Sequence, residues 1–511
     1  MQSGSRINAT CGFFGLHTCA EHVTSLFRPS CAKHAGIAGR YGRRCPRATN
    51  MVETGRAGSH HSKDEELHMP ETTRTVNVGL IGLGTVGGGT ALTIARNRDE
   101  YLRAFGVDLR VAKTCALEPE RAAELGIAPE AFTTDWHDVV ADPAVDIVVE
   151  LIGGEHPATE IFEAAFEAGK HVVTANKALL GRNMERLCGL AREAGVQLRC
   201  EASAGGGIPI VATLERSLVG NRMLTIAGIL NGTTNYILSR MTVEGSSFAD
   251  VLADAQRLGY AEADPSADVD GFDAASKVAI LSSIAFHTRV TTDDVYMQGI
   301  RDISPVDIDE ARKMGCVIKL LGIARMTDAG IDARVHPTMI PERHMLASVN
   351  GAMNAVFAVG DSVGETMFYG AGAGSFPTAS AVVGDILELA RAISRGEAPE
   401  AEAEPYERRF EIRSIEDLRC RYYLRLTTTH TNDALPAVAD TLEAFKIGVA
   451  EARQVVQDDG RCIVVLTEEA REGDIQAACA ELAKLPTIER VASLIRIEDT
   501  AAWAEGAEAN E

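Results

Sequence analysis

Between residues 75 and 195 the chain alternates short apolar runs with longer stretches of helical periodicity. Residues 76–81 form a β-rich apolar run that ends at a glycine, as expected of a buried parallel strand. The helical and strand-like runs that follow are, in chain order, residues 86–104, 109–116, 146–152, 171–175 and 178–194. Strands that alternate with helices predict an α/β fold with a doubly wound parallel sheet of the Rossmann type.

Beyond residue 200 the helical runs come closer together and strand-like runs follow them, which predicts a mixed α+β domain. The helical runs are residues 209–218, 233–242, 248–258 and 273–286, and the strand-like runs are residues 316–326, 331–340 and 362–369. A last helical run over residues 377–395 closes this region, and we expect it to return to the first domain.

The C-terminal part follows an acidic, proline-punctuated and aperiodic stretch over residues 396–411, which is typical of a linker. The unit after it has the order strand, helix, strand, strand, helix, strand. These elements are expected at residues 420–428, 433–445, 449–456, 462–467, 472–484 and 491–497. The βαββαβ order predicts a ferredoxin-like fold.

Residues 1–68 show no helical or strand period and carry nine Lys or Arg against five Asp or Glu. Such a stretch is a targeting peptide, a disordered tail, or chain that precedes a true start at Met69, and the sequence leaves these interpretations open. We divide the chain into an N-terminal extension (residues 1–73), a dinucleotide-binding domain (74–203), a second, α+β domain (204–376), a closing helix (377–395), a linker (396–418), the ferredoxin-like domain (419–499) and a tail (500–511).

Composition restricts the classes of partner. The net charge of −22 and the aromatic content of 5% argue against nucleic-acid binding, which needs a basic face and stacking side chains. No apolar stretch reaches the roughly 20 residues that span a bilayer, so no membrane partner is expected. The 11 cysteines include no CxxC pair, and we interpret them as reduced thiols of a cytoplasmic protein.

A glycine-rich motif, Gly82-Leu-Gly84-Thr85-Val86-Gly87, follows the first predicted strand and opens the first predicted helix. In that context GxGxxG indicates a dinucleotide site rather than a glycine-rich turn without a ligand. The first glycine permits the tight turn, the second lets the backbone approach a pyrophosphate, and the third lets the helix pack close to the sheet.

The choice between NAD and NADP depends on the residues after the second predicted strand. Enzymes that use NAD often place an acid there for the ribose. Glu118 could bind the ribose, whereas Lys113 or Arg121 could bind a 2′-phosphate. The sequence leaves both cofactors open.

Two further segments carry the residue types that hydride transfer to an aldehyde needs. The carbonyl oxygen gains negative charge as hydride arrives, and a lysine ammonium can both stabilise that charge and supply a proton. Lys177 follows a predicted strand, and Lys277 lies one helical turn after Asp273. Carboxylates in the same segment, Glu262, Asp268 and Asp273, could bind the α-ammonium of an amino-acid substrate. An Asp–Lys pair at this spacing is also common as a surface ion pair, so spacing alone leaves the site undecided.

At these residues the sequence resembles the homoserine dehydrogenase family, over about residues 74–395. The matching strings are residues 82–87, 174–177, 228–238, 258–265 and 372–381, together with the run Asp268, Asp273, Lys277. The resemblance implies an oxidoreductase that uses NAD or NADP for the reversible reduction of L-aspartate 4-semialdehyde to L-homoserine. That reaction belongs to the biosynthesis of threonine, methionine and isoleucine.

The resemblance also implies roles for single residues. Lys177 and Lys277 would polarise and protonate the C4 oxygen, while the substrate would be bound by Glu262, Asp268 and Asp273. The cofactor would contact Gly82, Gly84, Thr85, Val86, Gly87, Lys177 and Gly374. A structural sodium ion, which prefers oxygen ligands, would be bound by backbone carbonyls of Glu201, Ala204, Gly206 and Ile208. A homodimer or homotetramer that joins through the second domain is expected.

The C-terminal unit resembles an ACT domain, a module that binds regulatory amino acids and that in this family commonly confers inhibition by threonine. The chain departs from the usual turn after the first strand, an Asp followed by Pro-Gly, and has His430 and Asn432-Asp433 there. Asp433 lacks the φ freedom of glycine. Threonine control and a purely structural role in dimer contacts therefore both stay open.

Two other functions compete with this interpretation. Another Rossmann oxidoreductase acting on a related semialdehyde would leave the run of Asp268, Asp273 and Lys277 unexplained. An inactive amino-acid sensor built on the ACT-like unit would have no use for Lys177 and Lys277.

Overall fold

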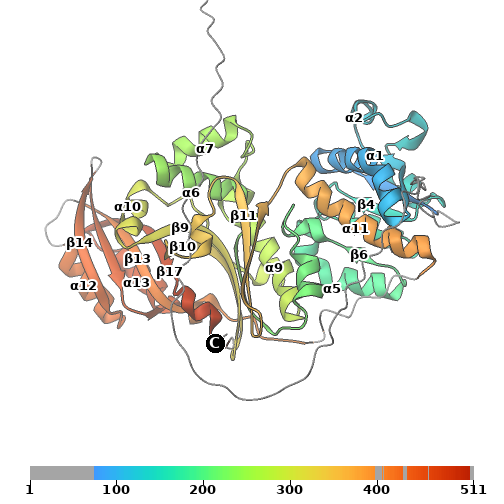
Figure 1. Ribbon diagram of the computed structural model, residues 1–511. Coiled ribbons are helices and arrows are strands. Elements are labelled where there is room, and N and C mark those ends of the chain that lie inside the picture. Colours follow the sequence, from blue (N-terminus) through green and yellow to red (C-terminus); the bar gives the residue numbers. More distant parts are fainter. Residues whose placement is uncertain (1–73, 398–405, 407, 430–433, 458–459, 507–511) are drawn as a thin grey trace, which may run out of the picture. The chain divides into compact units, whose positions relative to one another are not determined.

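The structure, a computed structural model, describes residues 74–397, 406, 408–429, 434–457 and 460–506. These residues form two β-sheets with helices packed on them (Figure 1). The predicted N-terminal extension, parts of the predicted linker and tail, and the turn residues His430, Asn432 and Asp433 lie outside the described residues.

The first sheet is the predicted doubly wound parallel sheet. Its strands have the order β3-β2-β1-β4-β5-β6, and every neighbouring pair is parallel. They are β1 (Thr75–Ile81), β2 (Asp108–Cys115), β3 (Phe132–Thr133), β4 (Ile147–Glu150), β5 (His171–Thr174) and β6 (Leu198–Arg199). The winding reverses between β1 and β4, and sheets of this kind bind ligands at that point, beyond the carboxyl ends of the strands.

The helices of the first domain are, in chain order, α1 (Thr85–Phe105), α2 (Pro119–Glu124), α3 (Trp136–Val140), α4 (Ala158–Glu167) and α5 (Lys177–Glu193). The closing helix α11 (Ser375–Arg395) returns to this domain as predicted and lies beside α1 (Figure 1). Its buried residues Val382 and Ile386 share one hydrophobic core with Leu80 of β1. The first domain is therefore completed by a segment far along the chain.

The second sheet is mixed, with the strand order β12-β11-β7-β9-β10-β17-β13-β15-β14. The second domain contributes β7 (Met223–Ile229), β9 (Cys316–Thr327), β10 (Gly330–Pro341), β11 (Met353–Gly360), β12 (Gly364–Ala371) and the short β8 (Tyr296–Met297), which pairs with β10. Its helices are α6 (Gly232–Glu244), α7 (Phe248–Arg257), α8 (Ser266–Val269), α9 (Phe272–Phe286) and α10 (Pro305–Lys313). The hydrophobic pattern predicts α6, α7, α9, β9, β10 and β12, but not α8, α10, β7, β8 or β11. Within the predicted helical run at residues 209–218 the structure has a short π-helix over Thr213–Ser217.

Helix α9 is buried over almost its whole length. It packs against α5 of the first domain on one side and against β9 and β10 of the second sheet on the other. Contact on both sides explains why its sequence is apolar nearly all round. The arrangement also brings the start of α9 close to the start of α5, where Lys177 lies.

The C-terminal unit has the predicted βαββαβ order. Its elements are β13 (Arg419–Thr428), α12 (Ala434–Ala444), β14 (Val449–Gln457), β15 (Gly460–Thr467), α13 (Glu472–Leu482) and β17 (Ile488–Ile497), with a short β16 (Ala470–Arg471). Strand β17 pairs in parallel with β10, where Thr338 faces Arg496 and Met339 faces Ile497. The sheets of the second domain and the C-terminal unit are therefore continuous, which the sequence pattern does not predict.

The described end of the predicted linker is packed rather than free. Tyr406 is only 5% exposed, and isolated bridges join Arg408 to Thr288 and Ile412 to Ile331. Residues 406 and 408–413 thus pack on the second domain.

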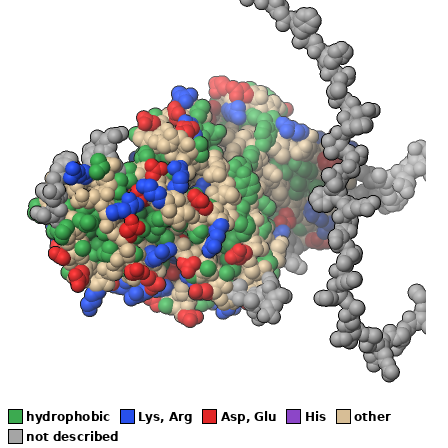
Figure 2. Space-filling model, turned by 60° about the vertical axis from the view of Figure 1, so that its left-hand side comes forward, with side chains coloured by type: hydrophobic (Ala, Val, Ile, Leu, Met, Phe, Trp, Pro, Cys, Tyr) green, Lys and Arg blue, Asp and Glu red, His purple; other side chains and the backbone are tan. Residues whose placement is uncertain are grey.

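The outer surface carries charges of both signs. On the face drawn in Figure 2, Lys and Arg side chains are interspersed with Asp and Glu. Among the described helices, not one has the length and apolar character that crossing a bilayer requires. The described cysteines are free thiols.

Candidate active site

The loop between β1 and α1 has the geometry of a phosphate-binding turn. Gly82 has a φ of +100°, and a Cβ there would lie 2.7 Å from the backbone of Leu151. A Cβ at Gly87 would lie 1.8 Å from the carbonyl oxygen of Gly82, so α1 can approach the loop only because this residue is glycine. At Gly84 a Cβ would meet no atom within 4 Å, so this residue faces open space at the N-terminus of α1. Helix N-termini of this kind bind phosphates.

The residues predicted to contact the cofactor from outside the glycine-rich loop lie beside it. Gly374, with a φ of +126°, precedes α11. Ser375 donates a hydrogen bond from its Oγ to the carbonyl oxygen of Thr85 at 2.8 Å. Thr85, Val86 and Gly374 are thereby brought to one place, although contact with a cofactor stays a prediction.

Arg121 also reaches this loop. Its Nε donates to the carbonyl oxygen of Leu83 at 3.2 Å, and its Nη1 lies 2.9 Å from Glu124. Glu118 is exposed just before α2, and Lys113 is half-buried within β2. Of the three candidates for the ribose or 2′-phosphate, Arg121 has a hydrogen bond to the glycine-rich loop.

Lys177 is held at the carboxyl end of β5 by a chain of buried hydrogen bonds. Asn176 caps α5, accepting from the N–H of Leu179 at 3.1 Å, and donates its own N–H to Thr174 Oγ1 at 3.0 Å. Thr174 donates in turn to Oε2 of the fully buried Glu150 at 2.7 Å. Glu150 and Asn176 therefore set the direction in which α5 begins. Glu150 is not among the predicted site residues, although it lies within the predicted strand at residues 146–152.

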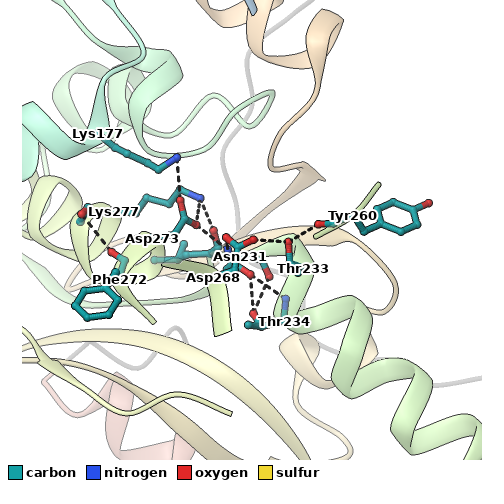
Figure 3. Close-up of polar contacts among 11 residues, drawn as sticks. Lys177, Asn231, Thr233, Thr234, Tyr260, Asp268, Phe272, Asp273 and Lys277 are labelled. Carbon is teal, nitrogen blue, oxygen red and sulfur yellow. Dashed lines mark hydrogen bonds and ion pairs between the residues drawn. The ribbon is translucent and has the colours of Figure 1, made fainter. Parts of the chain in front are cut away.

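The two lysines meet at a single carboxylate. Lys277 Nζ lies 2.7 Å from Asp273 Oδ2 and donates to the carbonyl oxygen of Leu230 at 2.7 Å. Lys177 Nζ lies 2.9 Å from the other oxygen, Oδ1, of Asp273. Asp273 thus lies between ammonium groups from α5 and α9 (Figure 3), as the predicted constellation requires.

The burial of these groups perturbs their acidity. Burial lowers the pKa of Lys277, although the neighbouring Asp273 acts in the opposite direction. Burial alone would raise the pKa of Asp273, but the ammonium groups of Lys277 and Lys177 hold it well below its usual range. Asp273 in turn raises the pKa of Lys177, whose side chain is 44% exposed. The two lysines therefore differ: Lys277 loses its proton more readily, and Lys177 keeps it.

Asn231 connects the acidic residues, a role that the sequence analysis missed. Its Nδ2 donates to Asp268 Oδ1 at 2.7 Å and to Asp273 Oδ2 at 2.9 Å, while its Oδ1 accepts from the N–H of Thr234 at the start of α6. Thr233 donates to the second oxygen of Asp268 at 2.9 Å (Figure 3). The signal was present, because both residues belong to the string at residues 228–238.

Glu262 lies in the exposed loop between α7 and α8. Gln256 holds this loop through a hydrogen bond to the carbonyl oxygen of Glu262 at 2.9 Å. Asp273 has the largest effect on the pKa of Lys177, and the carboxylates of Asp268 and Glu262 raise that pKa further. All three predicted substrate residues are thus within electrostatic range of Lys177, and Glu262 is the most exposed.

The predicted sodium ligands lie in the bend that joins the first domain to the second. The Glu201 carboxylate accepts hydrogen bonds from the backbone N–H groups of residues 210–212, so it caps the helical turn that follows. Within the described residues, the loop backbone hydrogen bonds do not end on the carbonyl oxygens of Ala204, Gly206 or Ile208.

A cavity of about 620 Å³ lies away from this chemistry. It is lined by the second half of α5, by β6 and by α11, and includes Glu215 and Glu388. Lys177, Lys277 and Asp273 are not among its lining residues.

Comparisons with known proteins agree with this geometry. The family model described as homoserine dehydrogenase, NAD binding domain, matches residues 82–201, and the model described as homoserine dehydrogenase matches residues 209–387. A homoserine dehydrogenase of Synechocystis sp. is 44% identical over 436 residues, which are 83% of the chain and 99% of that relative. The chain belongs to the homoserine dehydrogenase family.

Other homoserine dehydrogenases are similar to the chain to different extents. That of Corynebacterium glutamicum is 43% identical over 429 residues, 83% of the chain and 96% of that relative. The crystal structure of a homoserine dehydrogenase from Thiobacillus denitrificans matches with a TM-score of 0.77 at 43% identity, covering 83% of the chain and 99% of its own. A hyperthermophilic archaeal homoserine dehydrogenase in complex with NADPH matches with a TM-score of 0.53 at 27% identity, over 62% of the chain and 97% of its own. The protein is thus an oxidoreductase with homoserine dehydrogenase function and a nicotinamide-binding domain.

Proposed function

We propose that Lys277 and Lys177 perform the proton transfer and charge stabilisation by which the enzyme interconverts L-aspartate 4-semialdehyde and L-homoserine. The supporting observation is the Asp273 carboxylate, which lies within hydrogen-bond distance of both ammonium groups and holds them side by side (Figure 3). When bound at the glycine-rich loop, the nicotinamide supplies or accepts the hydride. The protein's own side chains must bind the substrate, stabilise the developing charge and transfer the proton.

The lysines have different roles because their environments differ. Burial lowers the pKa of Lys277, so its ammonium releases a proton more readily than an ordinary lysine. We therefore assign to Lys277 the protonation of the C4 oxygen during reduction, and its neutral form accepts the hydroxyl proton during homoserine oxidation. Asp273 raises the pKa of Lys177, which stays charged and stabilises the developing negative charge.

The substrate's α-ammonium is assigned to the carboxylates of Asp268, Asp273 and Glu262. Asn231 and Thr233 occupy one position on each Asp268 oxygen, at 2.7 and 2.9 Å, and so orient this carboxylate. A carboxylate has about four lone-pair positions, which leaves room for a ligand ammonium. Glu262 lies nearer the solvent and would complete the site or hold an ordered water.

Replacement of each lysine tests the assignment. General acid–base catalysis contributes about 100- to 10,000-fold, so Lys277→Met should lower kcat for semialdehyde reduction by that order while the enzyme still binds the cofactor. Lys177→Met should lower kcat as well. Lys313→Met, at a lysine whose side chain is 61% exposed on α10, is the matched control and should leave kcat unchanged. Full turnover by Lys277→Met would contradict the mechanism.

For the cofactor, we propose a preference for NADP over NAD. Arg121 is fixed beside the glycine-rich loop by its hydrogen bond to Leu83, where a guanidinium could pair with a 2′-phosphate. The archaeal relative in complex with NADPH is consistent with this choice. Arg121→Ala should raise the KM for NADP about tenfold and leave the KM for NAD unchanged. Equal changes for both cofactors would show that Arg121 does not select the phosphate.

A structural sodium ion at the bend of residues 201–208 is proposed from the carbonyl oxygens of Ala204, Gly206 and Ile208, together with that of Glu201. The support is that the loop hydrogen bonds of the described residues leave the first three oxygens unused. A bound ion stabilises the folded state by mass action. The Tm should therefore be higher in sodium chloride than in choline chloride at equal ionic strength, and equal Tm values would argue against the site.

The C-terminal unit is proposed to be an ACT domain that binds threonine as an inhibitor. Its βαββαβ order supports the ACT assignment. Because the residues of the departing turn lie outside the described part, the effector itself rests on the family resemblance. Homoserine oxidation rates that stay constant across a threonine titration would leave the unit with a structural role.

The enzyme is further proposed to be a cytoplasmic homodimer or homotetramer in threonine, methionine and isoleucine biosynthesis. Strand β12 lies at an edge of the second sheet and exposes Tyr369 by 57%, and edges of this kind pair or become covered. The free thiols fit a reducing compartment. Light scattering should give two or four times the mass of one chain, and a monomer would contradict the assembly.

A further inference from the structure

A short segment behind the substrate site contacts both the C-terminal unit and helix α8. We define it as the bridging segment, residues 296–302; it begins with β8, which pairs with β10. Gln298 continues this pairing by donating its N–H to the carbonyl oxygen of Val335 at 2.8 Å. The segment is thus anchored in the second domain at the point where β17 of the C-terminal unit joins the same sheet.

The C-terminal unit holds the bridging segment through side chains of its own strands. Arg496 of β17 donates from Nη1 to Gln298 Oε1 and from Nη2 to the hydroxyl of Tyr296 at 3.1 Å. Gln298 donates back from Nε2 to the carbonyl oxygen of Leu494 at 3.0 Å. Arg425 of β13 donates to the carbonyl oxygen of Asp302 at 3.1 Å. Both ends of the segment are therefore bound to the C-terminal sheet.

Arg496 is a rigid anchor for these contacts. It is fully buried, and its Nε and Nη2 both donate to the carboxylate of Glu472, which is also fully buried. A bidentate pair of this kind fixes the guanidinium in position as well as in direction. The side chain of Gln298 is thus held by buried groups of the C-terminal unit, while its backbone N–H is held by β10.

On its other side the bridging segment packs against α8, the short helix that carries Asp268. The N–H of Ile300 donates to the carbonyl oxygen of Val269 at 2.9 Å, and Arg301 Nε donates to Asp270 Oδ1 at 2.5 Å. A Cβ on Gly299 would lie 2.3 Å from the same Val269 oxygen, so the two backbones are in direct contact. Val269 is the neighbour of Asp268 in the chain, so displacement of the segment displaces this carboxylate.

We propose that Gln298 is a positioning residue for the amino-acid substrate: through it the C-terminal unit holds the bridging segment, and the bridging segment holds Asp268. The inference rests on the proposed role of Asp268 in substrate binding. A binding group that is held in place before the substrate arrives costs less free energy to order on binding. The C-terminal unit thus supports substrate affinity whether or not it binds an effector.

The test is the variant Gln298→Leu, which removes the two side-chain hydrogen bonds of Gln298 to the C-terminal unit. The pair of Arg496 and Glu472 and the bonds of Arg496 to Tyr296 and of Arg425 to Asp302 stay in place. The KM for homoserine should rise about fivefold, the size expected for the loss of a hydrogen bond, with the KM for the cofactor and kcat unchanged. Gln454→Leu makes the same replacement at an exposed position of β14, at the far edge of the C-terminal sheet, and should have no effect. An unchanged homoserine KM in Gln298→Leu, or an equal rise in both KM values, would overturn the proposal.

A double-mutant cycle separates positioning from general destabilisation. If Gln298 acts through Asp268, the fivefold effect of Gln298→Leu should disappear in an Asp268→Asn background. Effects that multiply independently would overturn the proposal. Gly299→Ala perturbs the segment from the other side, because the atoms nearest to its Cβ would belong to Val269 and Asp270, and it should also raise the homoserine KM alone. A wild-type enzyme inactive on homoserine would instead contradict the proposed function.

Discussion

Replacing Asp273 with asparagine removes the charge that the two lysines share. Lys277 would lose the carboxylate 2.7 Å from its ammonium and would keep only neutral acceptors such as the carbonyl oxygen of Leu230. Its side chain is 9% exposed, so water cannot take over the role of the carboxylate. The variant therefore leaves a buried ammonium unpaired, and such groups release their proton instead of staying charged.

In Asp273→Asn the loss of folding free energy comes from the proton that Lys277 would have to release when the chain folds. An ordinary lysine has a pKa of about 10.4, and each pH unit below that value costs about 1.36 kcal/mol for a lysine that is neutral only in the folded state. Asp273→Asn should therefore destabilise the protein by up to about 4 kcal/mol at pH 7.5 and by only about 1 kcal/mol at pH 9.5. The folded-state pKa is lowered, so the penalty is full at low pH and fades as pH approaches the pKa of the unfolded chain.

Denaturant unfolding of the wild type and the variant at both pH values measures this difference. Asp309→Asn is the matched control, because Asp309 forms an exposed ion pair with Arg312 at 3.1 Å, and its effect should stay within about 0.5 kcal/mol at either pH. If Asp273→Asn lowered the free energy of unfolding equally at both pH values, or more at pH 9.5, the buried unpaired ammonium would not be the cause.

Two further predictions concern the cofactor loop and the lysine pair. Gly84→Ala should keep the stability of the wild type, because its Cβ would meet no atom within 4 Å, yet it should raise the cofactor KM at least tenfold. Gly87→Ala should lower the Tm, because its Cβ would lie 1.8 Å from the carbonyl oxygen of Gly82. Comparable stability of the two variants in thermal unfolding would contradict this. For homoserine oxidation kcat should rise with pH as Lys277 deprotonates, and in Lys177→Met the profile should move to higher pH because the charge of Lys177 lowers the pKa of Lys277. An unmoved profile would show that the groups do not interact.

The hydrophobic pattern predicts β1, α1, β2, β4, β5 and α5 of the first domain, but not α2, α3, α4, β3 or β6. It misses β7 and β11 for a physical reason. β7 is buried at every residue, and β11 at every residue but the first, and periodicity alone cannot distinguish a continuous apolar run of this kind from a buried helix. The parallel pairing of β17 with β10 has no local signal at all, since residues such as Met339 and Ile497 are far apart in the chain.

In the site, too, features within one helix could be predicted from the sequence, whereas contacts between distant segments could not. The spacing of Asp273 and Lys277 along one helix is a local feature, and the structure places both side chains together as that spacing indicates. The contact of Lys177 with Asp273 depends on the packing of α5 against α9, and no pattern within either helix encodes it. Asn231 lay within a string already matched to the family, but an amide that connects two carboxylates is recognised only from its hydrogen bonds.

The most direct test of the account is the absorbance of reduced nicotinamide during incubation of the purified chain with L-homoserine and NADP. We expect a rise that depends on homoserine and that Lys277→Met abolishes. The rise should be absent with L-2-aminobutyrate, which lacks the hydroxyl group. A folded wild-type protein that produced no rise with either NADP or NAD would contradict the central claim that Lys177, Asp273 and Lys277 form a working homoserine dehydrogenase site.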